Sequence, residues 1–206
     1  MGIVTKTYIA TNQILGKFNL KLIREFPRPM TKFIMRSGKK DLIGAEIGVY
    51  KGEHAVSLFK NLTIERLYLI DPYSDYPGYK DAKRHYGKDQ DPLDIAEQQM
   101  KDTTEKWKFK ISYIKLPSWD VKKENLEMFD FIYIDGDHEY IGVKKDVEFY
   151  YTWLKEGGVM GGHDFDNGAV AEHDGVVKAV IEFAVKNNLK LYVDKPDWWF
   201  VKPKEK

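Results

Sequence analysis

The chain has 206 residues, of which 43% are hydrophobic and 32% charged, and its 33 basic and 32 acidic residues leave a net charge of +1. This length predicts a single domain that is large enough to bury a core. The balanced charge supplies no field that would draw the protein to nucleic acid or to a membrane surface, so we expect neither as a partner.

Two further properties of the composition exclude classes of site. The chain contains no cysteine, which excludes disulfides, thiolate metal sites and a cysteine nucleophile. No stretch of the sequence approaches the ~18 consecutive apolar residues of a membrane span, and the N-terminus lacks the apolar core of a signal peptide. We therefore expect a cytoplasmic protein.

The first forty residues carry a helical pattern. Apolar residues recur at helical spacing over residues 11–26, and Pro27 ends the pattern. The pattern predicts that segment 1–40 is helical and either packs on the rest of the domain or covers the site as a lid. An amphipathic helix of this kind is also a candidate contact in a homodimer.

From residue 41 the chain alternates between strand and helix patterns. Strands are predicted at 42–47, 67–70, 111–116 and 131–134, at a fifth run that begins at Val159, and in a closing hairpin of 189–193 with 198–201. Helices are predicted at 53–60, from Tyr140 to a stop at Gly157-Gly158, and around 176–183. The alternation indicates a doubly wound, mostly parallel sheet with helices on both faces, with an antiparallel strand from the hairpin, over 41–202.

Residues 73–107 do not fit this alternation. The segment is rich in tyrosine and charged residues, and it carries one helical pattern near 94–106. Long connections inside compact domains are commonly functional, so we interpret this segment as an insertion over the site.

The first strand runs into a glycine turn. Glu46 is followed by Gly48 and Gly52, which allow a tight turn and a helix start whose backbone N–H groups face a ligand. Tyr50 stands where dinucleotide-binding loops have their middle glycine, which argues against a dehydrogenase. A purely structural turn remains an alternative for this motif.

Asp71 directly follows the second predicted strand. An acidic side chain at this place can accept hydrogen bonds from both hydroxyls of a ribose. The alternative is a helix cap, which the following Pro72 makes less favourable.

Two polar clusters follow the next two strands. Asp135, Asp137 and His138 come after the run 131–134, and His163 and Asp164 come after the run that begins at Val159. Ligands bind at the carboxyl ends of strands in open parallel sheets, so the two clusters are expected to converge on one site. This convergence favours an enzyme.

Together these motifs resemble the class I S-adenosylmethionine-dependent methyltransferases, in the branch related to macrolide-sugar and catechol-type O-methyltransferases. The resemblance covers about residues 40–202 and implies a Rossmann-like, seven-stranded sheet that binds S-adenosyl-L-methionine. It implies that Glu46, Gly48 and Gly52 hold the amino-acid end of that cofactor, and that Asp71 binds its ribose. The cofactor-binding residues that it further implies are Ser118 at the adenine, Trp119 as a wall and Asp135.

The chain departs from the family pattern at two places. His54 and Ala55 stand where small hydroxyl residues usually follow the second glycine, and Leu116-Pro117 replaces the usual glycine before the serine. These departures concern details of cofactor contact.

The resemblance also implies a chemical centre. In the catechol-type relatives the metal ligands fall at Asp135, His163 and Asp164, so Mg²⁺ or Mn²⁺ is the expected ion, although Asp-Asp or Asp-Asn is the commoner final pair. His163 either supplies an imidazole ligand or hydrogen-bonds outside the ligand set, and a metal-free site remains an alternative. Asp135 and His138 are the predicted catalytic residues, with His138 at the position of the proton-abstracting base. A helix cap is the alternative for His138, and a capping carboxylate is expected at Asp137.

The predicted function is therefore methyl transfer to a hydroxyl of a small molecule, such as a sugar or polyphenol, assisted by a divalent metal. Three alternatives stay open: transfer to nitrogen or carbon in the same fold without a metal, a different nucleotide-binding enzyme, and an inactive cofactor-binding subunit.

Overall fold

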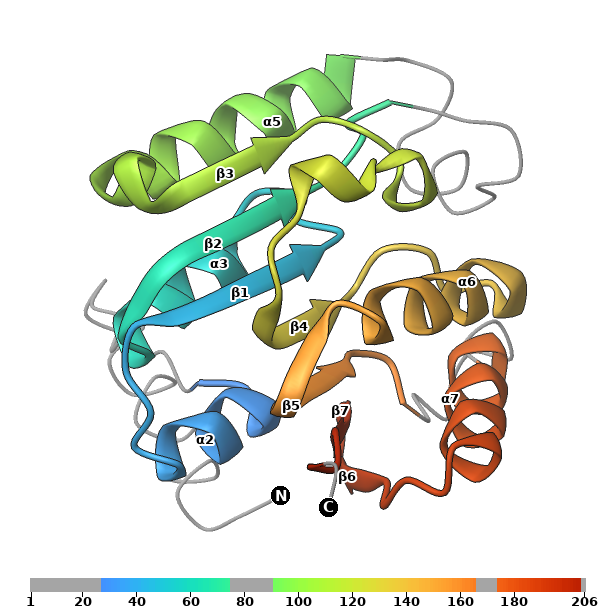
Figure 1. The fold of residues 1–206 in the computed structure, drawn as a ribbon. Coiled ribbons are helices and arrows are strands. Elements are labelled where there is room, and N and C mark those ends of the chain that lie inside the picture. The colour runs from blue at the N-terminus through green and yellow to red at the C-terminus, as the bar shows by residue number, and fades with distance from the viewer. Residues whose placement is uncertain (1–26, 75–90, 166–173, 205–206) are drawn as a thin grey trace, which may run out of the picture.

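The computed structural model describes residues 27–74, 91–165 and 174–204 (Figure 1). The helix predicted over residues 11–26 lies outside these ranges. Seven strands of the described chain form one sheet in the order β3-β2-β1-β4-β5-β7-β6. Their bounds are β1 Leu42–Ile47, β2 Ile64–Ile70, β3 Ile111–Ile114, β4 Phe129–Ile134, β5 Leu154–Gly162, β6 Tyr192–Asp194 and β7 Asp197–Val201.

The α-helices are α2 Pro29–Arg36, α3 Glu53–Asn61, α5 Asp91–Thr104, α6 Tyr140–Tyr151 and α7 Asp174–Lys186. Three short 3₁₀ turns are η1 Glu105–Lys110, η2 Ser118–Asp120 and η3 Lys123–Asn125. The helix expected near 94–106 is therefore present as α5. Within the described residues, none of the helices is both long and apolar enough to cross a membrane.

The pairing of the strands confirms the predicted fold. Strand β1 lies parallel to β2 and β4, and the parallel pairing continues to β3 on one side and β5 on the other. Strand β7 is antiparallel to β5, and β6 is antiparallel to β7. From β1 the chain adds β2 and β3 on one side of the sheet, and it then returns to add β4 and β5 on the other side of β1. The strand order therefore reverses between β1 and β4, and the carboxyl ends of these two strands are where a ligand is expected.

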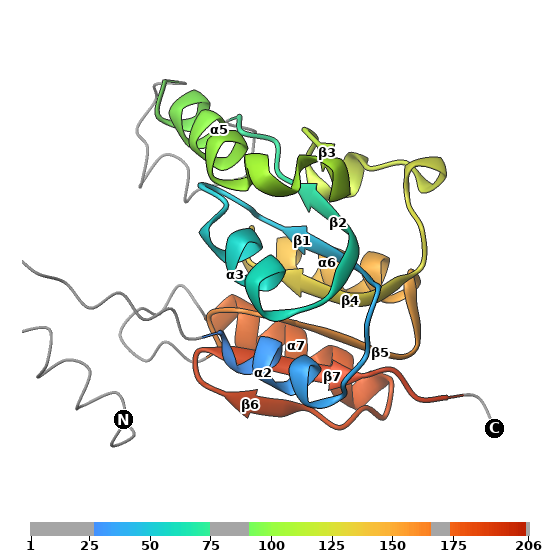
Figure 2. The ribbon, with the colours of Figure 1, turned by 90° about the vertical axis from the view of Figure 1, so that its left-hand side faces the viewer.

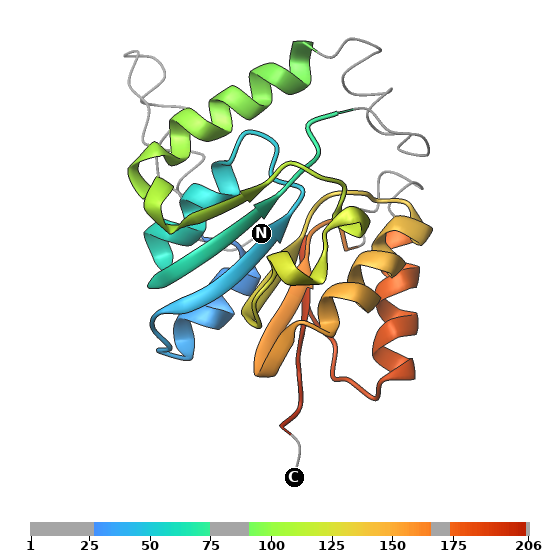
Figure 3. The ribbon, with the colours of Figure 1, turned by 45° about the horizontal axis from the view of Figure 1, so that its top comes forward.

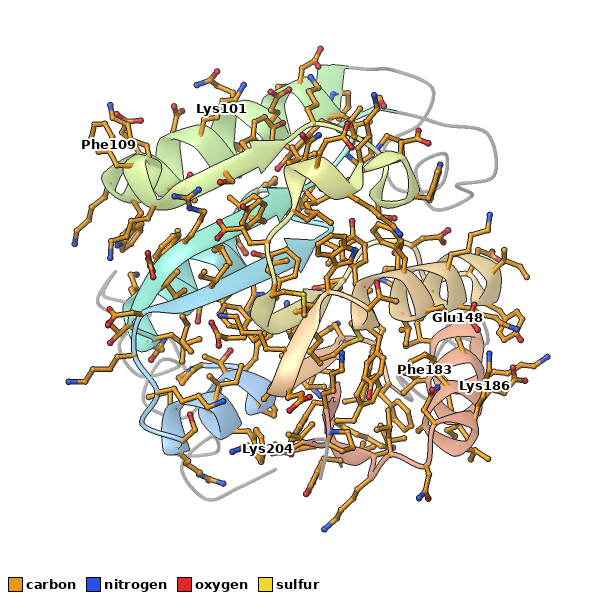
Figure 4. The ribbon with its side chains drawn as sticks, viewed as in Figure 1. Lys101, Phe109, Glu148, Phe183, Lys186 and Lys204 are labelled. Carbon is orange, nitrogen blue, oxygen red and sulfur yellow. The ribbon has the colours of Figure 1, made fainter. Side chains whose placement is uncertain are left out.

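Helices cover both faces of the sheet (Figure 2). Alternate residues of β1 point to opposite faces: Ala45 and Ile47 join one apolar cluster with α6 and α7, and Leu42 joins a second cluster with α2, α3 and α5. Helices α6 and α7 lie side by side in two views (Figures 1 and 3). Phe183 is buried in the first cluster, whereas Lys186 reaches Glu148 on the outer surface (Figure 4). Burial on both faces explains why the central strands are almost continuously apolar.

One boundary prediction is wrong. Strand β5 begins at Leu154, so Gly157-Gly158 lies inside a strand and does not end the preceding helix. Phe129 pairs with Leu154 and Phe131 with Val159, which shows that β5 carries extra residues in a bulge. The apolar spacing of Leu154 fits the helical stripe of α6, and only the pairing with β4 reveals that it belongs to the sheet.

Other boundaries shift by two or three residues. Strand β2 starts at Ile64 instead of residue 67, and β4 starts at Phe129 instead of residue 131. Strand β3 ends at Ile114 instead of residue 116, and β6 begins at Tyr192 instead of residue 189. Element ends depend on which neighbour is available for pairing, and the sequence pattern alone does not contain this information.

Candidate active site

A cavity of about 300 Å³ opens at the carboxyl ends of the central strands. Its walls come from the turn after β1, the residues after β2, the loop before α6 and the segment just before α2. The lining residues are Arg28, Glu46, Ile47, Gly48, Val49, Tyr50, Lys51, Glu53, His54, Asp71, Pro72, Tyr73, Ser74, Leu93, Pro117, Ser118, Asp135, Gly136, Asp137, His138 and Asp146. Tyr73, Ser74 and Leu93 show that the two described ends of the 73–107 insertion reach this cavity.

Gly48 brings two strand ends together. Its φ is +81°, and a Cβ at this position would lie 2.3 Å from the carbonyl oxygen of Asp135 and 2.4 Å from Cα of Gly136. A side chain would therefore separate the turn from the loop after β4. Gly52 closes the turn with a φ of +76° as the residue that precedes α3. The turn thus allows close approach between the glycine motif after β1 and the acidic motif after β4.

Asp71 holds the backbone of this turn. Its Oδ2 accepts hydrogen bonds from the N–H groups of Val49 at 2.8 Å and Tyr50 at 3.0 Å, and its Oδ1 accepts one from Tyr73 at 2.9 Å. Burial raises the pKa of Asp71, and the three N–H donors act in the opposite direction by stabilising the carboxylate. Oδ1 accepts only one of these bonds, which leaves it acceptor capacity toward the cavity.

Glu46 and His54 form a buried pair in the cavity wall. Nδ1 of His54 lies 3.1 Å from Oε1 of Glu46, and the imidazole packs against the ring of Tyr133 with 4.1 Å between centroids. The other two polar atoms, Oε2 of Glu46 and Nε2 of His54, have no hydrogen-bond partner among the residues that the structure describes. Glu46 therefore occupies the predicted cofactor end, with an imidazole beside it.

Ser118 also lies in the wall, but its hydroxyl is engaged. It donates a hydrogen bond to Oδ1 of Asp146, and its carbonyl oxygen accepts one from the hydroxyl of Tyr150 at 3.0 Å. Burial raises the pKa of Asp146 to about 7. Sequence reasoning missed Asp146, although a charged residue between Val143 and Val147 on the buried face of α6 was a signal for it.

Trp119 does not join the cavity wall formed by the described residues. Its side chain is 41% exposed, and Nζ of Lys145 lies 5.9 Å from the centre of its ring. The prediction of an adenine wall from Trp119 therefore receives no support from the structure. The η2 turn buries Ser118 and directs the next residue outward.

Asp135, His138 and Asp164 meet where β4 and β5 end. Nε2 of His138 lies 3.0 Å from Oδ2 of Asp164 and 3.8 Å from Oδ1 of Asp135. Burial alone would raise the pKa of Asp164, but hydrogen bonds from His138 and His163 hold this pKa well below its usual value. Asp137 accepts the N–H of Glu139, the residue just before α6, at 2.9 Å. This bond closes a turn ahead of the helix and does not cap a residue inside it, so the capping role of Asp137 stays a prediction.

These three residues can hold a metal ion. One donor atom from each of Asp135, His138 and Asp164 lies within 4.8 Å of the others, and two carboxylate oxygens with one imidazole nitrogen suit Mn²⁺, Fe²⁺ or Zn²⁺. The predicted ligand His163 lies beside the same carboxylates, with its Nδ1 3.1 Å from Oδ1 of Asp164 and 3.9 Å from Oδ1 of Asp135. The structure thus brings all four residues together. Of the two histidines in this cluster, His138 lines the cavity and His163 does not.

Arg28 is a site residue that sequence reasoning missed. One guanidinium nitrogen lies 3.4 Å from Oδ2 of Asp135, and another donates to the hydroxyl of Tyr133 at 2.8 Å. Tyr133 in turn donates to Asp197 at 2.9 Å, and Asp197 accepts the N–H of Met30 at 3.0 Å. Burial lowers the pKa of Arg28, but the neighbouring Tyr133, Asp135 and Asp197 outweigh this and raise it. Arg28 lies more than one hundred positions before Asp135 and Tyr133 in the chain, so no local sequence pattern predicts that they meet.

The sequence family described as "Methyltransferase domain" matches residues 45–165, which contain most of this site. The chain belongs to this family. Its fold and its match support an S-adenosylmethionine-dependent methyltransferase with S-adenosylmethionine as the methyl donor. No curated protein matches the sequence.

Solved structures with the same fold belong to methyltransferases with different acceptors. The O-methyltransferase NovP has a TM-score of 0.62 at 13% identity, with 84% of this chain and 76% of that chain covered. The N-methyltransferase NodS from Bradyrhizobium japonicum WM9, in complex with S-adenosyl-L-homocysteine, has a TM-score of 0.56 at 16% identity and 85% coverage of both chains. An rRNA methylase from Streptococcus thermophilus has a TM-score of 0.59 at 13% identity, with 89% of this chain and 100% of that chain covered. At such identities the likeness shows the fold and leaves the acceptor open.

Proposed function

We propose that this protein transfers the methyl group of S-adenosylmethionine to a hydroxyl of a small molecule, such as a sugar or a polyphenol. The observation that carries this proposal is the contact of His138 with Asp164 at the cavity wall. A hydroxyl must lose its proton when it is methylated, and a positioned imidazole is suited to accept that proton near neutral pH.

In this proposal the methyl donor lies along the strand ends from β1 to β3. Glu46 and the backbone of the turn from Gly48 to Gly52 hold its amino-acid end, and Asp71 accepts from its ribose. The wall made by Ser118 and Asp146 faces its adenine. Support comes from the cavity itself, which joins the turn, Asp71 and these two residues to Asp135 and His138.

The acceptor then lies next to His138. Nε2 lies 3.0 Å from Oδ2 of Asp164, and a proton held between these two atoms would leave Nδ1 as the basic nitrogen of the ring. The acceptor oxygen forms a bond to the methyl carbon while the carbon–sulfur bond breaks, its proton passes to Nδ1, and the sulfonium becomes a neutral thioether. Asp164 stabilises the imidazolium that results, and the alignment of oxygen, carbon and sulfur lowers the barrier through positioning.

A divalent ion at the same centre is the alternative to proton transfer by His138. Asp135, His138 and Asp164 would hold it, with His163 beside them, and His138 would then be a ligand and not the base. When bound, such an ion would acidify the acceptor hydroxyl. Arg28 already places a positive charge beside Asp135. We expect a chelator to suppress activity and Mg²⁺ or Mn²⁺ to restore it; full turnover in excess chelator would remove the metal from the proposal.

The acceptor class is tested with purified protein and methyl-labelled S-adenosylmethionine. A panel pairs hydroxylated sugars and polyphenols with amine analogues of the same size. We expect label only on the hydroxyl compounds. Label on the amines alone would show an N-methyltransferase and contradict the proposal. Calorimetry with S-adenosylhomocysteine and with NAD⁺ tests the cofactor separately, because the first should bind and the second should not.

A further inference from the structure

A chain of hydrogen bonds runs from β7 through β4 to the cavity. Asp197 on β7 is fully buried, and its Oδ1 accepts a hydrogen bond from the hydroxyl of Tyr133 at 2.9 Å. The same hydroxyl accepts one from Nη1 of Arg28 at 2.8 Å, and Nη2 of Arg28 lies 3.4 Å from Oδ2 of Asp135. Arg28 and Asp135 line the cavity, but Tyr133 and Asp197 are not among the described residues that do so.

The direction of these bonds follows from the groups themselves. A guanidinium carries a permanent charge and only donates hydrogen bonds, so the oxygen of Tyr133 is the acceptor from Arg28. The single proton of the Tyr133 hydroxyl is then left for Asp197. Burial raises the pKa of Tyr133, so the hydroxyl keeps this proton. Each group therefore has a defined partner, and the loss of one group breaks the chain at a known point.

Asp197 also fixes the main chain that carries Arg28. Its other oxygen, Oδ2, accepts the N–H of Met30 at 3.0 Å. Met30 is the second residue of α2, and Arg28 directly precedes this helix without capping it by its own side chain. A carboxylate at a helix N-terminus satisfies a free N–H group and is favoured by the helix dipole. One buried carboxylate thus holds Arg28 twice, through the backbone of α2 and through the hydroxyl of Tyr133.

Arg28 occupies one oxygen of Asp135 and leaves the other to the histidines. The guanidinium faces Oδ2, while Oδ1 lies 3.8 Å from Nε2 of His138 and 3.9 Å from Nδ1 of His163. The terminal torsion of an aspartate is soft, so a carboxylate turns readily unless its two oxygens have different partners. An arginine side chain loses much rotamer freedom when it is held in one place, so a fixed guanidinium needs an anchor. Tyr133 supplies this anchor.

We propose that Tyr133 and Asp197 are positioning residues for the reaction centre. They hold Arg28 against Oδ2 of Asp135, which keeps Oδ1 directed at the two histidines. The contacts themselves do not depend on the reaction. Their effect on turnover rests on the proposed function, because it takes Asp135 and His138 to act in methyl transfer. The role is the same whether His138 accepts the proton or serves as a metal ligand, since Oδ1 of Asp135 faces it in both cases.

Crystal structures of the wild type and of two variants test the contacts. Tyr133→Phe removes one hydroxyl and keeps the ring that packs against His54. Asp197→Asn keeps the shape of the side chain but replaces one accepting oxygen by a donating amide. In both variants we expect the guanidinium of Arg28 to leave Asp135, beyond the usual limit of about 4 Å for an ion pair. A wild-type position of the guanidinium in both variants overturns the proposal.

Rates in a double-mutant cycle test the effect on turnover. The reaction uses methyl-labelled S-adenosylmethionine and the hydroxyl compound of the panel that takes up label fastest. Tyr133→Phe should lower kcat roughly two- to tenfold, to the same extent as Arg28→Gln. The two changes together should lower kcat no further, because both break the same chain of contacts. Groups that act independently would instead give effects that multiply.

Tyr68→Phe is the matched control. The hydroxyl of Tyr68 also donates to a carboxylate, that of Glu127 at 2.8 Å, and Tyr68 is also buried, but neither residue lines the cavity that the described residues form. This variant should lower Tm without changing kcat. Thermal unfolding gives the Tm of every variant, and all rates are measured well below the lowest one. If Tyr133→Phe does not fold, Asp197→Asn takes its place in the cycle.

Two kinetic results would also overturn the proposal. The first is a wild-type kcat for Tyr133→Phe together with a lowered Tm, which would show a purely structural hydroxyl. The second is a pair of effects, from Arg28→Gln and Tyr133→Phe, that multiply in the double variant. If the wild type labels none of the hydroxyl compounds, the proposed function fails. The crystal structures then still decide whether Tyr133 and Asp197 hold Arg28 against Asp135.

Discussion

The two ends of the cavity are built in different ways. At the turn after β1, polar side chains hold the backbone: Asp71 fixes three N–H groups, and Gly48 allows the close approach to the next strand end. At the ends of β4 and β5, charged side chains hold one another through contacts among Asp135, His138 and Asp164. We call the first the fixed end, because hydrogen bonds set its backbone conformation, and the second the charge-balanced end, because opposite charges hold its side chains in place. Changes at the first should therefore alter binding and stability, and changes at the second should alter rate.

The largest effect is expected at the charge-balanced end. His138→Ala should lower kcat by a factor on the order of 10²–10⁴, because it removes the proposed base, and it should leave S-adenosylhomocysteine affinity unchanged. Single-turnover kinetics and calorimetry separate the two quantities. His163→Ala removes the other imidazole that contacts the same carboxylates, but His163 is not in the described cavity wall, so this variant should lower kcat less than His138→Ala does. If His138→Ala retains most of its turnover, the base is elsewhere.

The second-largest effect is expected at the fixed end, on the affinity for S-adenosylhomocysteine. Asp71→Ala should weaken S-adenosylhomocysteine by a factor on the order of 10², because it removes the proposed ribose acceptor and releases the turn. Asp130→Ala is the control: Asp130 accepts the N–H of Ile43 at 2.9 Å at the opposite end of β1, so it should lower stability without changing affinity. Near-native affinity of Asp71→Ala would remove the ribose assignment.

A third prediction concerns pH and the buried carboxyl of Asp146, which lies beside Ser118 in the cavity wall. Asp146 has a pKa raised to about 7, so the folded protein keeps a proton that the unfolded chain loses above about pH 4. Its contribution to stability is fully present below that pH and is lost as the pH rises to about 7. We expect Asp146→Asn to remove this part of the pH dependence, which amounts to roughly 5 °C or more in Tm. Parallel Tm-versus-pH curves for wild type and variant over pH 4–7 would contradict the assignment.

The smallest effect is expected for Arg28. Arg28→Gln removes a partly exposed charge beside Asp135 and should lower kcat roughly tenfold or less, as partly exposed ion pairs contribute little. Arg28→Lys keeps the charge but loses the planar fork that reaches Tyr133, so it should recover part of the rate. Equal rates for wild type and Arg28→Gln would show that the guanidinium only attaches the segment before α2 to the sheet.

Much of the fold was predictable because it follows from local patterns. The bounds of β1 were predicted correctly from a short apolar run that ends before a glycine turn. The start of β5 was not, because Leu154 fits a helical stripe and its true partner, Phe129, lies on another strand. A bulge is created by pairing, and pairing is not visible in the spacing of one segment.

The site was predictable to a similar extent. Strand-end motifs identified Glu46, Asp71, Asp135 and His138, all of which line the cavity. These motifs did not identify Asp146, whose carboxyl is recognised only from its burial against Ser118. They also predicted Trp119 as part of the cavity wall, but the described residues that line the cavity do not include it. Side-chain burial depends on neighbours from other elements, so motif position alone does not decide it.

The sequence by itself determined the order of strands and helices and the presence of polar residues after four strands, because both depend on neighbouring residues in the chain. Only the tertiary structure decided which of these residues meet. It placed Arg28 beside Asp135, put His138 in the cavity wall with His163 next to it, and left Glu46 and His54 with two atoms that have no partner among the described residues. These contacts follow from strand order and from the approach of the turn to the loop after β4, which bring together groups that the chain keeps far apart.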